Sequence, residues 1–117
     1  MRLPDGYSGS LIYNKPYSAR SRKPLERDIE KKACKGIRAL GGITRKMNGL
    51  GFRSWPDRLI IGNGFAFWIE FKRPGEEPTP LQRKLHDQLG RMSQTVYVFD
   101  NAEQAVEIFR EWKEEYD

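Results

Sequence analysis

The chain has 117 residues and a formal net charge of +5, with 32% charged and 38% hydrophobic residues. This length supports one domain with a modest core and is too short for two, and the hydrophobic content excludes a disordered chain. One histidine and one cysteine, Cys34, exclude an intrachain disulfide and the usual tetrahedral zinc site. The chain shows neither an apolar run of transmembrane length nor a signal-peptide core, so we expect an intracellular protein.

A basic domain of this size commonly meets a polyanion, and nucleic acid is the commonest such partner. The alternative is a basic surface without a dedicated partner. Residues 1–24 are predicted to form a basic, partly ordered N-terminal arm, because they are rich in Gly, Ser, Tyr and Pro and show no periodicity. The folded domain is expected to span residues 25–117.

The domain begins with a predicted helix. Pro24 suits a first helical turn because its φ is fixed, and Gly41-Gly42 is a typical helix end. Apolar residues recur between them at helical spacing: Leu25, Ile29, Ala33, Ile37 and Leu40. Cys34 is expected to be a small buried residue of this helix.

A hairpin follows a predicted strand at 43–48 and a glycine-containing loop at 49–54. The segments 57–62 and 65–72 are rich in Ile, Phe and Trp and are predicted as strands. Asn63-Gly64 between them is a strong hairpin signal, and a type I′ turn requires positive φ at both of these residues. Trp68 is expected to belong to the core.

The remaining elements are a loop at 73–78, a helix that starts at Thr79 with Pro80 in its first turn, a strand at 95–99 and a last helix capped by Asn101. The order α-β-β-β-α-β-α predicts an α/β fold with a mixed central sheet flanked by helices. The helix from Thr79 bridges two strands, as in a parallel crossover. Its apolar residues share one face: Leu81, Leu85, Leu89 and Met92. The last helix shows the same pattern: Ala102, Ala105, Val106, Phe109 and Trp112.

The predicted hairpin brings two carboxylates together. If Asn63-Gly64 is the whole loop, Asp57 is opposite Glu70, and directly opposed residues point to the same side of a sheet. Period-two alternation places Lys72 on that side as well. A three-residue loop would instead slip the register and turn one acid to the other face.

Opposed like charges about 5 Å apart at Cβ are unfavourable. A proton on one carboxylate, the charge of Lys72, or a divalent cation would compensate. Two close acids with a backbone oxygen suit a hard cation such as Mg²⁺. The alternative is a surface acid pair with a neighbouring lysine in an ordinary salt bridge.

These residues resemble the VRR-Nuc family, the virus-type replication-repair nucleases, within the PD-(D/E)xK nuclease superfamily. The resemblance covers about residues 25–109, and the whole string of motifs is more specific than any one of them. In the family a glycine precedes Pro-Asp, whereas this chain has Trp55 there and a shifted Gly51. The matching segments are Glu26-Arg27-Asp28-Ile29-Glu30, Gly41-Gly42, Arg45-Lys46, Pro56-Asp57-Arg58, Glu70-Phe71-Lys72 and Pro80-Leu81-Gln82.

The resemblance implies a restriction-endonuclease-like core and a metal-dependent DNA endonuclease. Mg²⁺ or Mn²⁺ would be bound by Asp57, Glu70 and the backbone carbonyl of Phe71, and Lys72 would position or activate the attacking water. Glu26 would reach the metal from the first helix, with Glu30 a weaker candidate. Standalone members resemble homodimeric resolvases of four-way DNA junctions, so a homodimer acting on branched DNA is expected in the cytoplasm of a bacterial or phage-infected host cell.

Several supporting residues have alternative interpretations. Gln82 would help at the catalytic site, but Thr79-x-x-Gln82 is also a capping box. Glu26 also suits a solvated first helical turn. His86 follows Gln82 by one turn and is interpreted as a surface histidine rather than a general base.

Basic residues near the candidate site are predicted to contact phosphates, which positions DNA without reading its sequence. Alternation turns Arg58 away from Asp57, so Arg58 is the weakest of them. The predicted phosphate contacts are Arg45, Lys46, Arg53, Arg73 and Lys84. Two rival functions are a non-catalytic nucleic-acid-binding protein that retains the fold, and a sequence-specific restriction-type endonuclease, for which the short chain leaves little room.

Overall fold

The computed structural model describes residues 24–49, 51 and 53–116. The predicted arm at 1–24 lies, except for Pro24, outside these residues. The described chain forms seven elements in the predicted order: α1 (Glu26–Ala39), β1 (Ile43–Lys46), β2 (Arg58–Gly62), β3 (Phe65–Phe71), α2 (Pro80–Arg91), β4 (Val96–Phe99) and α3 (Ala102–Tyr116). None of the helices within the described residues has both the length and the apolar character needed to cross a membrane.

The four strands form one sheet in the order β1-β2-β3-β4. The first two pairings are antiparallel, and β3 pairs with β4 in parallel. This confirms the predicted mixed α/β sheet and the parallel connection through α2. β3 and β4 are almost wholly buried, which explains why their sequences read as continuous apolar runs rather than alternating ones.

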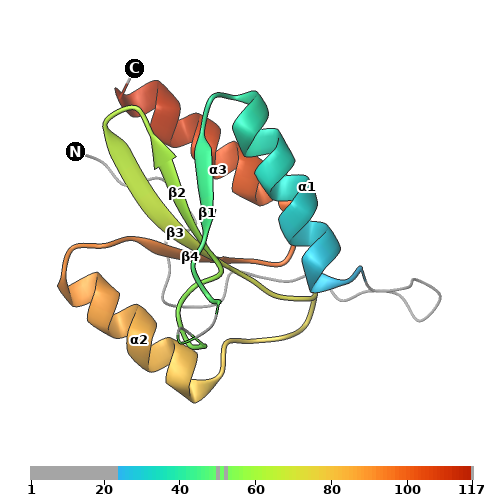
Figure 1. The fold of residues 1–117 in the computed structure, drawn as a ribbon, viewed down its shortest axis with the longest axis vertical. Coiled ribbons are helices and arrows are strands. Elements are labelled where there is room, and N and C mark those ends of the chain that lie inside the picture. Colours follow the sequence, from blue (N-terminus) through green and yellow to red (C-terminus); the bar gives the residue numbers. More distant parts are fainter. Residues whose placement is uncertain (1–23, 50, 52, 117) are drawn as a thin grey trace.

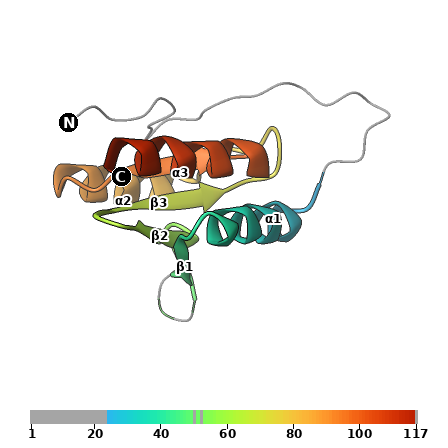
Figure 2. The same ribbon diagram turned by 90° about the horizontal axis from the view of Figure 1, so that it is seen from above.

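The core lies between the sheet and the two helices α1 and α3, which contact each other (Figure 1). Figure 2 shows α3 running along the length of β3. Ile29, Ala33 and Ile37 of α1 are buried, as their helical spacing predicts, and so are Cys34, Trp68 and Trp112. Aromatic rings fill the space under α3: Phe65, Phe67, Tyr97, Phe109 and Trp112.

The hairpin has the predicted two-residue loop but a different turn. Gly62 pairs with Phe65, so Asn63-Gly64 is the whole connection. Gly64 has a φ of 91°, whereas Asn63 does not adopt positive φ. The type I′ prediction is therefore wrong, and the signs of φ are those of a type II turn. The register does not depend on this difference, because loop length alone sets it.

Two helices differ in detail from the prediction. α1 begins at Glu26, with Leu25 as its N-cap and Pro24 before the cap, so Pro24 does not occupy the first turn. α2 begins at Pro80 as predicted, but its apolar face is not its buried face. Leu81 and Met92 are 61% and 75% exposed, and the buried residue of α2 is His86.

Candidate functional site

The β2–β3 hairpin brings Asp57 and Glu70 to the same side of the sheet. The pairs run from Gly62–Phe65 to Arg58–Ile69, so Asp57 and Glu70 are the next pair outward. The predicted register is therefore confirmed. Both side chains are only 2% exposed, which contradicts the alternative of a surface acid pair.

Asp57 is held from two directions. Its Oδ2 accepts a hydrogen bond of 2.6 Å from the backbone N–H of Phe71, and its Oδ1 accepts one from the Asn48 side-chain amide. Its backbone carbonyl accepts a bond of 2.9 Å from the N–H of Met47. The β2–β3 pairing ends at Ile69, so the backbone N–H of Phe71 bonds to the Asp57 carboxylate rather than to a main-chain carbonyl of β2. Asp57 is thus fixed at the point where β2 and β3 separate.

Glu70 faces α2 and the lysine that follows it on the same side of β3. Its Oε2 accepts a 3.2 Å hydrogen bond from Gln82 Nε2 and lies 3.7 Å from Lys72 Nζ. Its Oε1 is buried and has no hydrogen-bond partner among the described residues. His86 Nε2 is 3.8 Å from that oxygen, too far for a hydrogen bond.

Burial dominates the electrostatics of the two acids. It raises the pKa of Asp57, and the neighbouring Glu70 charge raises it further, while the Phe71 N–H lowers it. Burial also raises the pKa of Glu70, although Lys72 opposes this effect. Two buried carboxyls side by side are costly to ionise together unless a positive charge joins them.

His86 is a buried neighbour of this pair, so its prediction as a surface histidine is wrong. The side chain is 2% exposed, and burial lowers its pKa to about 4. It is therefore neutral at neutral pH and does not form an ion pair with Glu70. Neither ring nitrogen has a hydrogen-bond partner among residues that the structure describes. The available sequence signal was its position one turn after Gln82.

Gln82 makes both of the contacts that its sequence context left open. Its Oε1 accepts a 2.8 Å hydrogen bond from the backbone N–H of Thr79. The backbone N–H of Gln82 donates in turn to Thr79 Oγ1, which completes the capping box. The other end of the amide donates to Glu70. The helix cap therefore orients a side chain that contacts the acid pair.

The two glutamates of α1 have different surroundings. Glu26 is half-buried at the start of the helix, where burial raises its pKa and the charge of Lys72 opposes the rise. Glu30 instead bonds Arg58 Nε at 2.6 Å and lies 3.5 Å from Lys46 Nζ. Of the two, Glu26 lies in the field of Lys72, whereas Glu30 is already paired with two cations.

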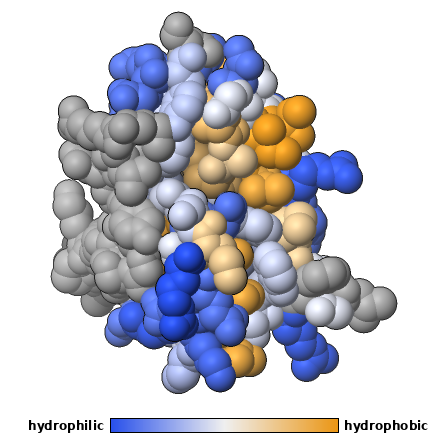
Figure 3. Space-filling model, turned by 90° about the vertical axis from the view of Figure 1, so that its left-hand side faces the viewer, coloured by the Kyte–Doolittle hydropathy of each residue, from blue (hydrophilic) through white to orange (hydrophobic). Residues whose placement is uncertain are grey.

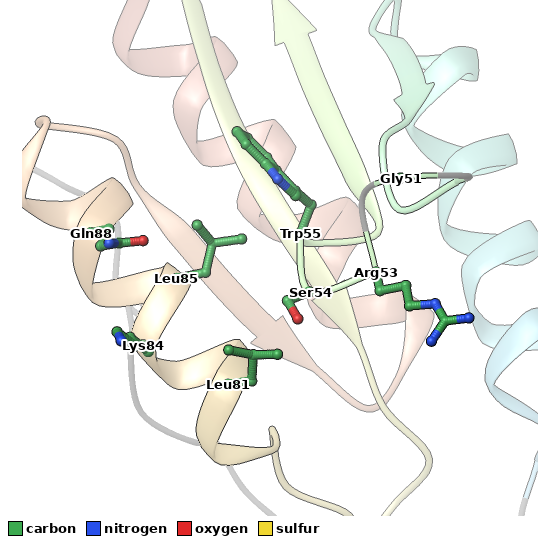
Figure 4. A pocket seen from close by; sticks show the side chains of 8 residues that line it. All are labelled: Gly51, Arg53, Ser54, Trp55, Leu81, Lys84, Leu85 and Gln88. Carbon is green, nitrogen blue, oxygen red and sulfur yellow. The ribbon is translucent and has the colours of Figure 1, made fainter.

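The predicted phosphate contacts separate into two groups: Lys46 and Arg73 contact other protein groups, and the rest lie on the acid-pair side of the sheet. Lys46 lies on the opposite side of the sheet from the acid pair, beside Glu30, and Arg73 Nε donates to the backbone carbonyl of Pro24 at 3.2 Å. Arg45 is exposed on β1 opposite Leu59, on the acid-pair side. Arg53 and Lys84 line a common cavity of about 550 Å³ between the loop before β2 and α2 (Figure 4).

The chemistry of the acid pair fits a divalent cation. Within the described residues, no group of three or more His, Cys, Asp or Glu side chains could hold a metal ion. The candidate ligands here are instead two carboxylates and one main-chain carbonyl. That carbonyl belongs to Phe71, which lies beyond the last residue pair between β2 and β3. The unpartnered Glu70 Oε1 and the raised pKa values of both acids are features that a bound Mg²⁺ or Mn²⁺ would relieve.

The chain is similar to a curated protein and to a solved structure. The chain is 40% identical over 77 residues to a protein named "Putative nuclease p44" of Acyrthosiphon pisum secondary endosymbiont phage 1, covering 65% of this chain and 83% of that protein. It also superposes on a solved structure described as a VRR_NUC domain, with a TM-score of 0.64 and 26% identity over 73% of this chain and 94% of the other. No family model matches the chain.

Proposed function

The chain belongs to the VRR-Nuc family of PD-(D/E)xK nucleases, and we propose that it is a metal-dependent endonuclease that hydrolyses phosphodiester bonds of branched DNA. One observation carries the proposal: Asp57 and Glu70 are buried side by side, with Lys72 Nζ 3.7 Å from Glu70 and one Glu70 oxygen without a partner. Such an arrangement destabilises the metal-free fold, and its chemistry suits a cation and a phosphate.

Each side chain has a distinct role in this proposal. Asp57, Glu70 and the carbonyl of Phe71 would hold Mg²⁺ or Mn²⁺, which when bound polarises a phosphate and lowers the pKa of a water. Lys72 supplies positive charge where negative charge develops on the phosphate during attack. Gln82 orients Glu70 through its amide. Glu26 shares the field of Lys72 and is the proposed contribution of α1.

DNA is the proposed substrate because the chain carries a net charge of +5 and because Arg45, Arg53 and Lys84 lie on the acid-pair side of the sheet. These cations would contact phosphates without reading sequence. We further propose a homodimer acting on four-way junctions, since a two-fold assembly matches paired cuts in a branched substrate.

The test is incubation of the purified protein with labelled four-way junction, flap and plain duplex DNA in Mg²⁺, Mn²⁺ or EDTA. Cleavage should require the metal and favour the branched substrates. Lys72→Ala should lower the single-turnover rate by about 10²–10³-fold, the usual loss when one transition-state charge contact is removed. Asp57→Ala should abolish cleavage.

Lys31→Ala is the matched control, because Lys31 is an exposed lysine of α1 outside the proposed site. Equal cutting by Lys72→Ala and Lys31→Ala would refute the site. Binding without any metal-dependent cutting would instead support a non-catalytic nucleic-acid-binding protein, and cutting of plain duplex alone would refute the junction preference.

A further inference from the structure

A cavity of about 550 Å³ lies between α2 and the loop that leads into β2. Its size falls in the range of small-molecule sites. Figure 4 shows Leu81 and Leu85 pointing from α2 towards Ser54 and Trp55 of that loop. On the face of the molecule that carries α2 and the hairpin, apolar surface lies directly beside strongly hydrophilic surface (Figure 3).

The lining combines an apolar interior with positive charge. Trp55, Leu81 and Leu85 supply the apolar side chains, and Arg53 and Lys84 supply two cations. In Figure 4 the Arg53 side chain extends from the loop to the side away from α2, whereas Lys84 lies on α2 itself. None of the described lining residues carries a carboxyl group. This charge pattern complements an anionic ligand with a flat apolar part.

Trp55 provides an aromatic surface whose position is set by the sheet. Its ring centroid lies 5.3 Å from that of Trp68, with the planes inclined by 48°. Trp68 is buried in β3, and its Nε1 donates a 3.1 Å hydrogen bond to Gln94 Oε1. Trp55 thus packs against the buried Trp68 of β3 and also lines the cavity. Leu81, on the opposite wall, remains 61% exposed in the described structure.

Two segments, α2 and the loop before β2, contribute to both the cavity and the acid pair. In the loop, Trp55 lines the cavity and Asp57 follows two residues later. On α2, Leu81 and Leu85 directly precede Gln82 and His86, whose side chains turn towards Glu70. The cavity therefore lies on the same side of the sheet as the acid pair, and both are bordered by α2.

We propose that this cavity receives the base of one unpaired nucleotide, with Trp55 as its stacking surface and Arg53 and Lys84 beside the flanking phosphates. Stacking on an aromatic ring is sequence-tolerant, because every base has a π face. A base inside an intact duplex is already stacked on both faces, so entry requires a nucleotide that is unpaired or extruded. This inference rests on the proposed function, and it identifies an unpaired nucleotide beside the scissile phosphate as the feature of branched DNA that is recognised.

Fluorescence anisotropy in EDTA measures binding without cleavage. The probes are a labelled DNA fork with an unpaired arm, the same fork with an abasic nucleotide moved one position at a time through that arm, and a fully paired duplex. Wild-type protein should bind the intact fork about tenfold more tightly than the fork that lacks the critical base. Its affinity for the duplex should match that for the critical abasic fork within about threefold.

Leu81→Glu places a carboxylate in the lining of the cavity, at a residue that is 61% exposed. Met92→Glu makes the same change of charge and polarity at the C-cap of the same helix, at a residue that is 75% exposed and outside the cavity. Leu81→Glu should weaken fork binding about tenfold relative to Met92→Glu, while the two variants bind duplex alike. Trp55→Ala, once circular dichroism shows that it is folded, should bind intact and abasic forks equally.

Equal binding of intact and abasic forks by wild-type protein would overturn the inference, as would indistinguishable fork binding by Leu81→Glu and Met92→Glu. A protein that selects the base but does not cut in Mg²⁺ or Mn²⁺ would refute the proposed function and leave the base site standing. A protein that cuts without this selectivity would refute the base site alone.

Discussion

Asp57→Asn should remove the part of the pH dependence that Asp57 gives to the stability of the metal-free protein. Burial raises the pKa of Asp57 from the ordinary value of 3.8 to about 8, and that of Glu70 also rises. Between about pH 4 and 8 these two carboxyls therefore hold more protons in the folded protein than in the unfolded chain. The contribution of the acid pair to the free energy of unfolding in EDTA should therefore be highest at acidic pH and fall as the pH rises towards 8. His86, whose pKa burial lowers to about 4, contributes with the opposite sign below about pH 6.5, and this contribution is common to wild type and variant.

The size of the effect follows from the same rise. One pKa unit corresponds to about 1.4 kcal/mol, so the rise at Asp57 alone sets an upper bound of roughly 6 kcal/mol. The charge of Lys72, which lies 3.7 Å from Glu70, and local relaxation reduce this cost. We expect a loss of about 2 kcal/mol across the window, which for a chain of this length is about 8 °C in Tm.

Asparagine preserves the shape and the hydrogen bonds. The new amide oxygen accepts from the N–H of Phe71, and Asn48 flips its own amide to accept from the new NH₂ group. The unpartnered Asn48 Oδ1 is available for this bond. The variant should equal the wild type at acidic pH and exceed it by about 2 kcal/mol near pH 8.

Urea denaturation in EDTA, followed by tryptophan fluorescence at several pH values, measures the difference. Glu103→Gln is the control, because Glu103 is exposed and its hydrogen bond from Lys32 lowers rather than raises its pKa. Parallel pH profiles for wild type and Asp57→Asn would refute the reasoning. A stability difference between Asp57→Asn and wild type that shrinks as the pH rises from 4 to 8 would refute it as well.

Two further predictions concern α2 and the hairpin. Gln82→Glu keeps the oxygen that caps α2 but replaces the donor to Glu70, 3.2 Å away, with a second carboxylate oxygen, so single-turnover cleavage should fall about tenfold or more and the Tm should fall as well. Thr79→Ala should instead lower stability by about 1 kcal/mol and leave cleavage nearly unchanged. Gly62→Ala should lower the free energy of unfolding by about 1–3 kcal/mol in urea denaturation, because a Cβ there would lie 2.1 Å from Phe65 Cζ. Gly49→Ala is the matched control, because among the described residues no atom lies within 4 Å of a Cβ there, and it should change stability by under about 0.5 kcal/mol; equal effects at the two glycines would contradict the steric explanation.

Local chemistry accounts for what the sequence predicted well. The register of the hairpin depends only on loop length, and Asn63-Gly64 set that length even though the turn is not type I′. The opposition of Asp57 and Glu70 follows directly from that register. The capping box of α2 is also local, because Thr79 and Gln82 are three residues apart.

Tertiary packing decided what the sequence did not predict. The apolar spacing of α2 indicated a buried face of leucines, but the structure turns His86 towards the acids and leaves Leu81 exposed. A helix over a polar site is oriented by that site, and hydrophobic periodicity carries no information about such packing. The side of Lys46 was different, because alternation along the predicted strand already places it on the opposite face from Arg45; only its contact with Glu30 depends on packing.

Calorimetric titration of the EDTA-stripped protein with Mn²⁺ tests the metal site most directly. We expect uptake that is lost in Glu70→Gln and retained in Glu103→Gln, which removes an exposed acid of α3. Loss of uptake at Glu70 alone would support a divalent ion held by the buried acid pair. Equal uptake by wild type and Glu70→Gln, or no uptake by the wild type, would contradict it.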